Sequence, residues 1–122
     1  MSKIFIVEDD DFLRGLLSKK LKEDGHEVEQ AENGEKAKEL LSKSTPDLLV
    51  LDLLLPGLHG LEVLSWLREQ EGGLESIPVI ILSNLGDEED IEKAYEIGTT
   101  DFLVKAKYTP QEIVEKVRET IK

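Results

Sequence analysis

A run of four apolar residues at positions 48–51 constrains the fold of this chain more than any other segment. The turn residues Pro46 and Asp47 precede the run, and Asp52 follows it directly. A short segment that is apolar at every position is typical of a strand buried on both faces of a parallel sheet. Ligands of open α/β sheets bind outside the carboxyl ends of the strands. We therefore expect Asp52 to stand at a ligand site.

Similar runs recur along the chain and alternate with amphipathic segments. The full runs are residues 4–7, 48–51, 79–82 and 102–104, and a weaker one at 27–29 holds one apolar residue and suits a sheet edge. Between and after them, apolar residues keep helical spacing at Leu13, Leu16, Leu17 and Leu21; Ala37, Leu40 and Leu41; Leu61, Leu64 and Leu67; Ile91, Ala94 and Tyr95; and Ile113, Val114, Val117 and Ile121. Five strands alternating with five helices predict a doubly wound five-stranded parallel sheet with helices on both faces.

Residues at the expected helix ends support this division. Gly25 and Gly98 follow the first and fourth helical segments, where glycine commonly ends a helix. Thr109 and Pro110 suit the N-cap and the first position of the last helix. A chain of 122 residues can bury the core of one domain but has no room for two. We expect one domain over residues 1–122.

Composition and charge exclude several classes of protein. The formal net charge of −12 argues against binding to nucleic acid or to an anionic membrane surface, because phosphate groups need lysine and arginine. This charge favours divalent cations or basic partners, although solubility alone would also explain it. No cysteine is present, which excludes disulfides and thiolate chemistry. The apolar run at residues 4–7 is too short for a signal peptide or a membrane span, so we expect a soluble cytoplasmic protein.

Acidic side chains follow two of the predicted strands. Glu8 and Asp9 come after the first strand, and Asp52 comes after the third. If these strands are neighbours, the three carboxylates share one crevice, where like charges repel unless a cation lies between them. A dication such as Mg²⁺, which takes carboxylate and phosphate oxygens, explains the cluster. The alternative is that residues 8–11 only cap the first helix.

Two other strands end in polar groups of a different kind. Ser83 brings a hydroxyl to the end of the fourth strand, and Lys105 brings an ammonium to the end of the fifth. Either residue alone would be an ordinary turn residue. Together with the two carboxylate positions, they indicate that a tetrahedral anion is held against a metal ion.

These residues resemble the receiver domain of two-component response regulators, of the single-domain CheY-like kind. The resemblance covers essentially the whole chain and rests on residues 4–10, 47–60, 79–83 and 98–105. It implies the flavodoxin-like strand order 2-1-3-4-5. It also implies that Asp52 accepts a phosphoryl group from a sensor histidine kinase or a phosphotransfer protein. Such a domain is a signalling switch that assists its own phosphorylation and dephosphorylation, and not an enzyme with a separate substrate.

The family implies a role for each residue around the phosphoacceptor. Glu8, Asp9 and Asp52, with the backbone carbonyl of Leu54, would hold Mg²⁺ directly or through water. The metal would shield the incoming phosphoryl group and orient the Asp52 carboxylate. Lys105 would pair with a phosphoryl oxygen.

The family also implies a switch at Ser83 and Phe102. Ser83 would hydrogen-bond a second phosphoryl oxygen, and Phe102 would move inward into the space that Ser83 leaves. The face made by the fourth helix, fifth strand and fifth helix would then rearrange for an unknown downstream protein. The domain would act as a monomer or as a phosphorylation-dependent dimer. The alternative for Phe102 is an ordinary core aromatic.

Three residues depart from the family pattern. Ala106 follows Lys105 where the family has a proline after a cis peptide bond. We therefore expect a trans bond between Lys105 and Ala106, which would fix the direction of the Lys105 side chain less firmly. Asn84 stands where a small residue is usual and could crowd the route to Asp52. His59 replaces an acidic residue before the third helix, which we expect to weaken the helix N-cap.

Leu54 and Leu85 occupy the positions that tune acyl phosphate hydrolysis in the family. Apolar side chains cannot orient an attacking water. We therefore expect a slowly decaying phosphoryl group.

Other functions stay open at this stage. Asn84 and Ala106 favour a receiver-like binding module that works without phosphate. A dehalogenase-type phosphatase would need an acid at position 54, where Leu54 stands. A flavin-binding protein would not place Glu8 and Asp9 where a phosphate must approach a helix N-terminus. The chain ends with its last predicted helix, so we expect a stand-alone regulator or an excised domain.

Overall fold

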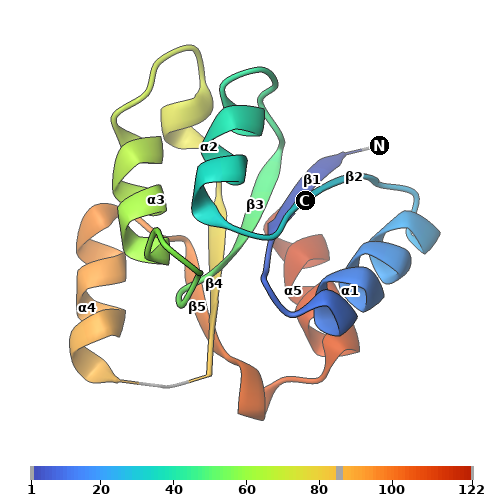
Figure 1. Ribbon diagram of the computed structural model, residues 1–122. Coiled ribbons are helices and arrows are strands. Elements are labelled where there is room, and N and C mark those ends of the chain that lie inside the picture. Colours follow the sequence, from blue (N-terminus) through green and yellow to red (C-terminus); the bar gives the residue numbers. More distant parts are fainter. Residues whose placement is uncertain (1, 85–86, 122) are drawn as a thin grey trace.

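Five parallel strands form one sheet with the order β2-β1-β3-β4-β5 in the computed structural model, which describes residues 2–84 and 87–121 (Figure 1). The strands are β1 Lys3–Val7, β2 Glu27–Ala31, β3 Leu48–Asp52, β4 Val79–Ser83 and β5 Asp101–Val104. The helices are α1 Asp11–Glu23, α2 Gly34–Leu41, α3 Gly60–Arg68, α4 Glu88–Ile97 and α5 Pro110–Thr120, with the short 3₁₀ turns η1 Leu74–Ser76 and η2 Lys105–Lys107. The predicted fold class and strand order are confirmed.

The sheet has a separate core on each face because successive strand residues point to opposite sides. On one face, Phe5 and Val7 of β1 pack with the helices α2, α3 and α4. On the other, Ile4 and Ile6 pack with α1 and α5. Figure 1 shows the two groups of helices on opposite sides of the sheet. The polar strand β2 lies at the edge, as its composition predicts.

The strand order reverses between β1 and β3, and this arrangement positions the site. The two strands are hydrogen-bonded neighbours, with Val7 paired to Leu51. The residues that follow, Glu8 and Asp52, therefore reach the same edge of the sheet. Asp52 is the last residue of β3 itself and pairs with Leu82 of β4. The crevice at this reversal is where doubly wound sheets bind ligands.

The start of α3 lies directly against the end of β3, and glycine makes this approach possible. The Gly60 N–H donates to the Leu53 carbonyl at 2.8 Å. A Cβ atom at Gly60 would lie 2.4 Å from the Asp52 carbonyl oxygen and 2.8 Å from the Leu53 Cα. These distances are too short for any side chain, so the backbone around Asp52 depends on Gly60.

His59 caps α3 with its imidazole, and the expectation that this cap is weaker than a carboxylate cap stays a prediction. His59 Nδ1 accepts a hydrogen bond from the Leu61 N–H at 3.2 Å. The Glu62 side chain accepts one from the His59 N–H at 3.3 Å, which completes a capping box. The imidazole thus replaces the expected carboxylate as the acceptor at this helix end.

Tyr95 also differs from its expected place. Helical spacing groups it with Ile91 and Ala94, but its side chain is 48% exposed, whereas Ala94 is fully buried. In α4, Ala94 is the buried residue and Ile97 packs partly buried against the same core, whereas Tyr95 lies on the exposed side of the helix. In the described part of the chain, no helix is both long and apolar enough to cross a membrane.

Candidate functional site

Three carboxylates meet at the carboxyl edge of the sheet. Oxygen atoms of Glu8, Asp9 and Asp52 lie within 4.8 Å of one another. Glu8 and Asp52 are buried, and Asp9 is exposed. The predicted convergence of the two strand ends is therefore present, with one side of the cluster open to solvent.

Lys105 is the cation of this cluster. Its Nζ lies 2.7 Å from Glu8 Oε1 and 3.4 Å from Asp52 Oδ2, and its side chain is 15% exposed. Lys105 begins η2 directly after β5, and the peptide bond to Ala106 is trans. The lysine thus reaches the carboxylates without the cis bond that is usual in the family.

Burial dominates the electrostatics of Asp52. The pKa of the Asp52 carboxyl is raised to about 8, chiefly by burial and also by the hydrogen bond and charge of Glu8, and the charge of Lys105 offsets only part of this rise. Burial alone would lower the pKa of the Lys105 ammonium, but its hydrogen bond to Glu8 and the charges of Asp52 and Glu8 raise it above the usual value. One ammonium therefore does not balance the carboxylates, and a further cation would stabilise them.

The donor atoms fit a hard dication. All three side chains of the cluster offer carboxylate oxygens, which Mg²⁺ and Mn²⁺ prefer. Their spacing is compatible with ligation directly or through water, and the exposed Asp9 leaves an entry path. The backbone carbonyl of Leu54 as a further ligand stays a prediction.

Ser83 and Phe102 occupy the positions that the sequence predicts for them. Ser83 ends β4 beside Asp52 of β3 and is 1% exposed. Phe102 lies in β5, opposite Ile81 of β4, and packs partly buried against the core under α2, α3 and α4. The switch role of both residues stays a prediction.

Two further residues, Leu54 and Asn84, follow the ends of β3 and β4 at the site. Leu54 is 49% exposed, and its N–H donates to Asp52 Oδ1 at 3.4 Å. Asn84 is exposed. The expectation about Leu85 concerns a residue outside the described part of the chain.

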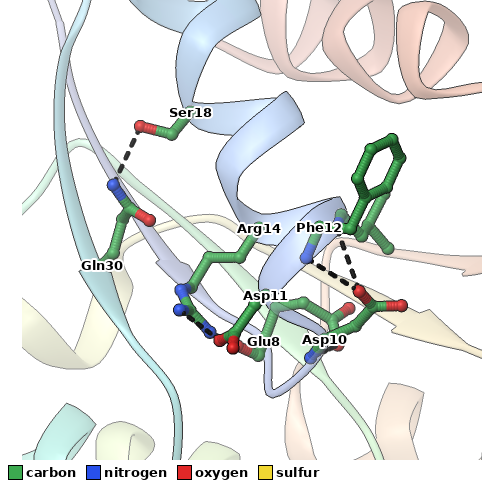
Figure 2. A network of polar contacts seen from close by, with 8 residues as sticks. Glu8, Asp10, Asp11, Phe12, Arg14, Ser18 and Gln30 are labelled. Atoms are coloured by element: carbon green, nitrogen blue, oxygen red, sulfur yellow. Dashed lines mark hydrogen bonds and ion pairs between the residues drawn. The ribbon is translucent and has the colours of Figure 1, made fainter.

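One residue of the site was missed by sequence reasoning. Arg14 of α1 extends back toward Glu8, where its Nη1 donates to the Glu8 carbonyl at 2.7 Å (Figure 2). The position of Arg14 one turn into α1 is a sequence signal that could have indicated this contact. An arginine at that position is, however, equally typical of a solvent-exposed helix face.

The fold and this edge together define a doubly wound α/β domain with a carboxylate and lysine site at its topological switch point. The family model "Response regulator receiver domain" matches residues 4–118. The chain belongs to this family of receiver domains.

Individual relatives agree with this assignment. The transcriptional regulatory protein ResD of Bacillus subtilis is 33% identical over 121 residues, which cover 99% of this chain and 48% of ResD. The chain thus spans about half the length of the curated relatives it matches.

Solved structures match over nearly their whole length. The chemotaxis response regulator CheY4 of Vibrio cholerae has a TM-score of 0.90 at 26% identity, covering 98% of both chains. The phosphorylated cyanobacterial phytochrome response regulator RcpA has a TM-score of 0.86 at 32% identity, covering 97% of this chain and 91% of RcpA. The Mn²⁺-bound form of response regulator Rcp1 has a TM-score of 0.81 at 28% identity, covering 98% and 91%.

Proposed function

We propose that Asp52 is the phosphoacceptor of this receiver domain and that a histidine kinase or a phosphotransfer protein is the donor. The observation that carries the proposal is the cluster of Glu8, Asp9 and Asp52 within 4.8 Å, with Lys105 Nζ 3.4 Å from Asp52 Oδ2. The phosphorylated state of the relative RcpA supports it. Residues 1–122 would form one receiver domain in this proposal.

The transfer is a displacement at phosphorus. A carboxylate oxygen of Asp52 forms the new P–O bond while the P–N bond to the donor histidine breaks. The electron pair of the broken bond stays on the imidazole nitrogen, which takes a proton from solvent. Lys105 pairs with a phosphoryl oxygen, and the Ser83 hydroxyl donates a hydrogen bond to another. The product is an acyl phosphate on Asp52.

The metal in this proposal is Mg²⁺, held by Glu8, Asp9, Asp52 and the backbone carbonyl of Leu54. When bound, it supplies positive charge that stabilises the phosphoryl oxygens. Glu8 and Asp52 would supply buried carboxylate oxygens to it, and the exposed Asp9 would leave room for solvent ligands. The Mn²⁺-bound relative Rcp1 supports a divalent cation here.

The output is a change of surface and not turnover of a separate substrate. The phosphoryl group adds about −1.5 to −2 charges next to Ser83 and Lys105. Ser83 moves toward it, Phe102 follows inward, and the α4-β5-α5 face shifts toward its active arrangement for a downstream protein. The domain assists its own phosphorylation and dephosphorylation in the cytoplasm, where the histidine kinase is phosphorylated.

Intact mass spectrometry tests the proposal. The protein is incubated with a small phosphodonor and Mg²⁺, beside Asp52→Asn and a sample with a metal chelator. We expect one added phosphoryl group in the wild type and none in either control. An unmodified wild type that still binds Mg²⁺ would contradict the phosphoacceptor role of Asp52.

A further inference from the structure

The guanidinium of Arg14 connects the first turn of α1 to the end of β1. Its Nη1 lies 2.7 Å from the Glu8 carbonyl oxygen, and its Nη2 lies 2.6 Å from Asp11 Oδ1. The Arg14 side chain is 16% exposed, whereas that of Asp11 is 82% exposed. Figure 2 shows the Arg14 side chain extending from α1 toward Glu8 and Asp11. A largely buried cation thus has a backbone carbonyl as its buried partner.

The Glu8 carbonyl lies where the sheet can no longer satisfy it. The Glu8 N–H still donates to the Ala31 carbonyl at 3.1 Å, and Ala31 is the last residue of β2. β2 ends there, and among the described residues no backbone N–H donates to the Glu8 carbonyl, which accepts from Arg14 instead. The guanidinium therefore extends the hydrogen bonding of β1 by one peptide into the loop.

This bond completes a set that fixes the peptides on both sides of Asp9. The Asp10 N–H donates to Glu8 Oε2 at 3.1 Å. Asp10 in turn accepts from the Phe12 and Leu13 N–H groups as the N-cap of α1. With the Glu8 carbonyl held by Arg14, Asp9 lies between two anchored residues. The direction of its carboxylate relative to Asp52 then depends on that backbone.

Arginine suits this task better than lysine would. Its planar guanidinium donates in two fixed directions at once, here to the Glu8 carbonyl and to Asp11. An ammonium at the same place keeps the charge but does not have this fixed geometry. Partners that orient metal ligands commonly change metal affinity 10- to 100-fold when they are removed.

We propose that Arg14 is a positioning residue of the metal site, which holds the Glu8–Asp9 peptide so that both carboxylates face Asp52. The inference rests on the proposed function, since it concerns the same Mg²⁺ site. It adds a residue from outside the acidic cluster to that site.

Calorimetric titration with Mg²⁺ alone, in 0.15 M salt, tests the role of Arg14. We expect Arg14→Met to bind Mg²⁺ about tenfold more weakly than the wild type. Arg14→Lys should lose about threefold, because an ammonium can still donate to the Glu8 carbonyl. Asp11→Asn should stay within about twofold, because it leaves the bond between Arg14 and Glu8 intact.

Arg68→Met is the matched control for a general loss of stability. Arg68 also donates to backbone carbonyls, those of Glu75, Ile77 and Gly98, but at the opposite edge of the sheet. We expect its Mg²⁺ affinity to equal that of the wild type. Folding of every variant is checked by the fluorescence of Trp66, the single tryptophan.

The outcomes separate the two proposals. Equal Mg²⁺ affinity of the wild type and Arg14→Met would overturn the role of Arg14 and leave the proposed function standing. An equal loss in Arg68→Met would also overturn it, because the effect would then be general. A wild type that binds no Mg²⁺ would overturn both. If Arg14→Met does not fold, Arg14→Lys decides, and an unchanged affinity would overturn the inference.

Discussion

Lys105 lies closer to Glu8 than to Asp52, with Nζ-to-oxygen distances of 2.7 Å and 3.4 Å. The ion pair joins the end of β5 to the end of β1 across two intervening strands. In the metal-free, unphosphorylated protein, the Lys105 ammonium serves chiefly to neutralise the buried Glu8 carboxylate. Binding of a dication at the carboxylates would release Lys105 for the phosphoryl oxygens, because Glu8 would then have another cation.

Replacing Lys105 with methionine should destabilise the protein in the absence of metal. The substitution leaves Glu8 and Asp52 buried without their ammonium, and we expect a loss of about 1–3 kcal/mol in the free energy of unfolding at pH 8. Urea unfolding in chelator measures it, and Mg²⁺ should restore part of the loss. An unchanged unfolding midpoint would show that the pair does not stabilise the fold.

Asp52→Asn should stabilise the metal-free protein, and the gain should grow with pH. The pKa of Asp52 is raised to about 8 in the folded state, chiefly by burial. Between the unfolded value of 3.8 and about pH 8, the unfolded state binds fewer protons, so wild-type stability falls as pH rises. The variant has no such penalty. We expect a gain of about 2–4 kcal/mol at pH 8 and almost none at pH 4.

Urea unfolding in chelator across this pH range measures the gain. The control is Glu69→Gln, which changes an exposed carboxylate. A gain that is the same at pH 4 and pH 8 would contradict a raised pKa at Asp52.

Two glycine substitutions should act in opposite directions. Gly60→Ala should lower the free energy of unfolding by more than about 2 kcal/mol, because its Cβ would lie 2.4 Å from the Asp52 carbonyl oxygen. It should also weaken Mg²⁺ binding, since that backbone must shift. Gly15→Ala should raise stability by about 0.5–1 kcal/mol, because Gly15 lies inside α1 with nothing within 4 Å of its Cβ position. Equal effects in urea unfolding would refute this contrast.

A polar residue at position 54 should shorten the lifetime of the phosphoryl group. Leu54 follows Asp52 by two residues, is 49% exposed and offers no polar side-chain group to orient water. We expect Leu54→Asn to lose the phosphoryl group several-fold faster than the wild type, as followed by intact mass after the donor is removed. Leu58→Asn, in the same loop region, serves as the control. Equal decay of Leu54→Asn and wild type would reject the slow-decay hypothesis.

The fold was predictable because its signals are local. The β3 and β4 segments are apolar at nearly every position, a pattern typical of strands that are buried on both faces of a parallel sheet. The polar β2 segment indicated an edge in the same way. Once the strands are parallel, their carboxyl ends lie at one edge, which brought Glu8 and Asp52 together in the prediction.

The sequence by itself thus determined the class of fold and the carboxylate cluster. Tertiary structure decided which groups contact one another there. The ion pair of Lys105 with Glu8 and the raised pKa of Asp52 depend on distances and burial set by strands that pack together from far apart in the chain. The bond from Arg14 to Glu8 and the imidazole cap at His59 join residues that are close in sequence, but they depend on the directions that those side chains take in the folded protein. Residue type and spacing carry little information on such contacts, because one side chain can reach several partners of similar chemistry.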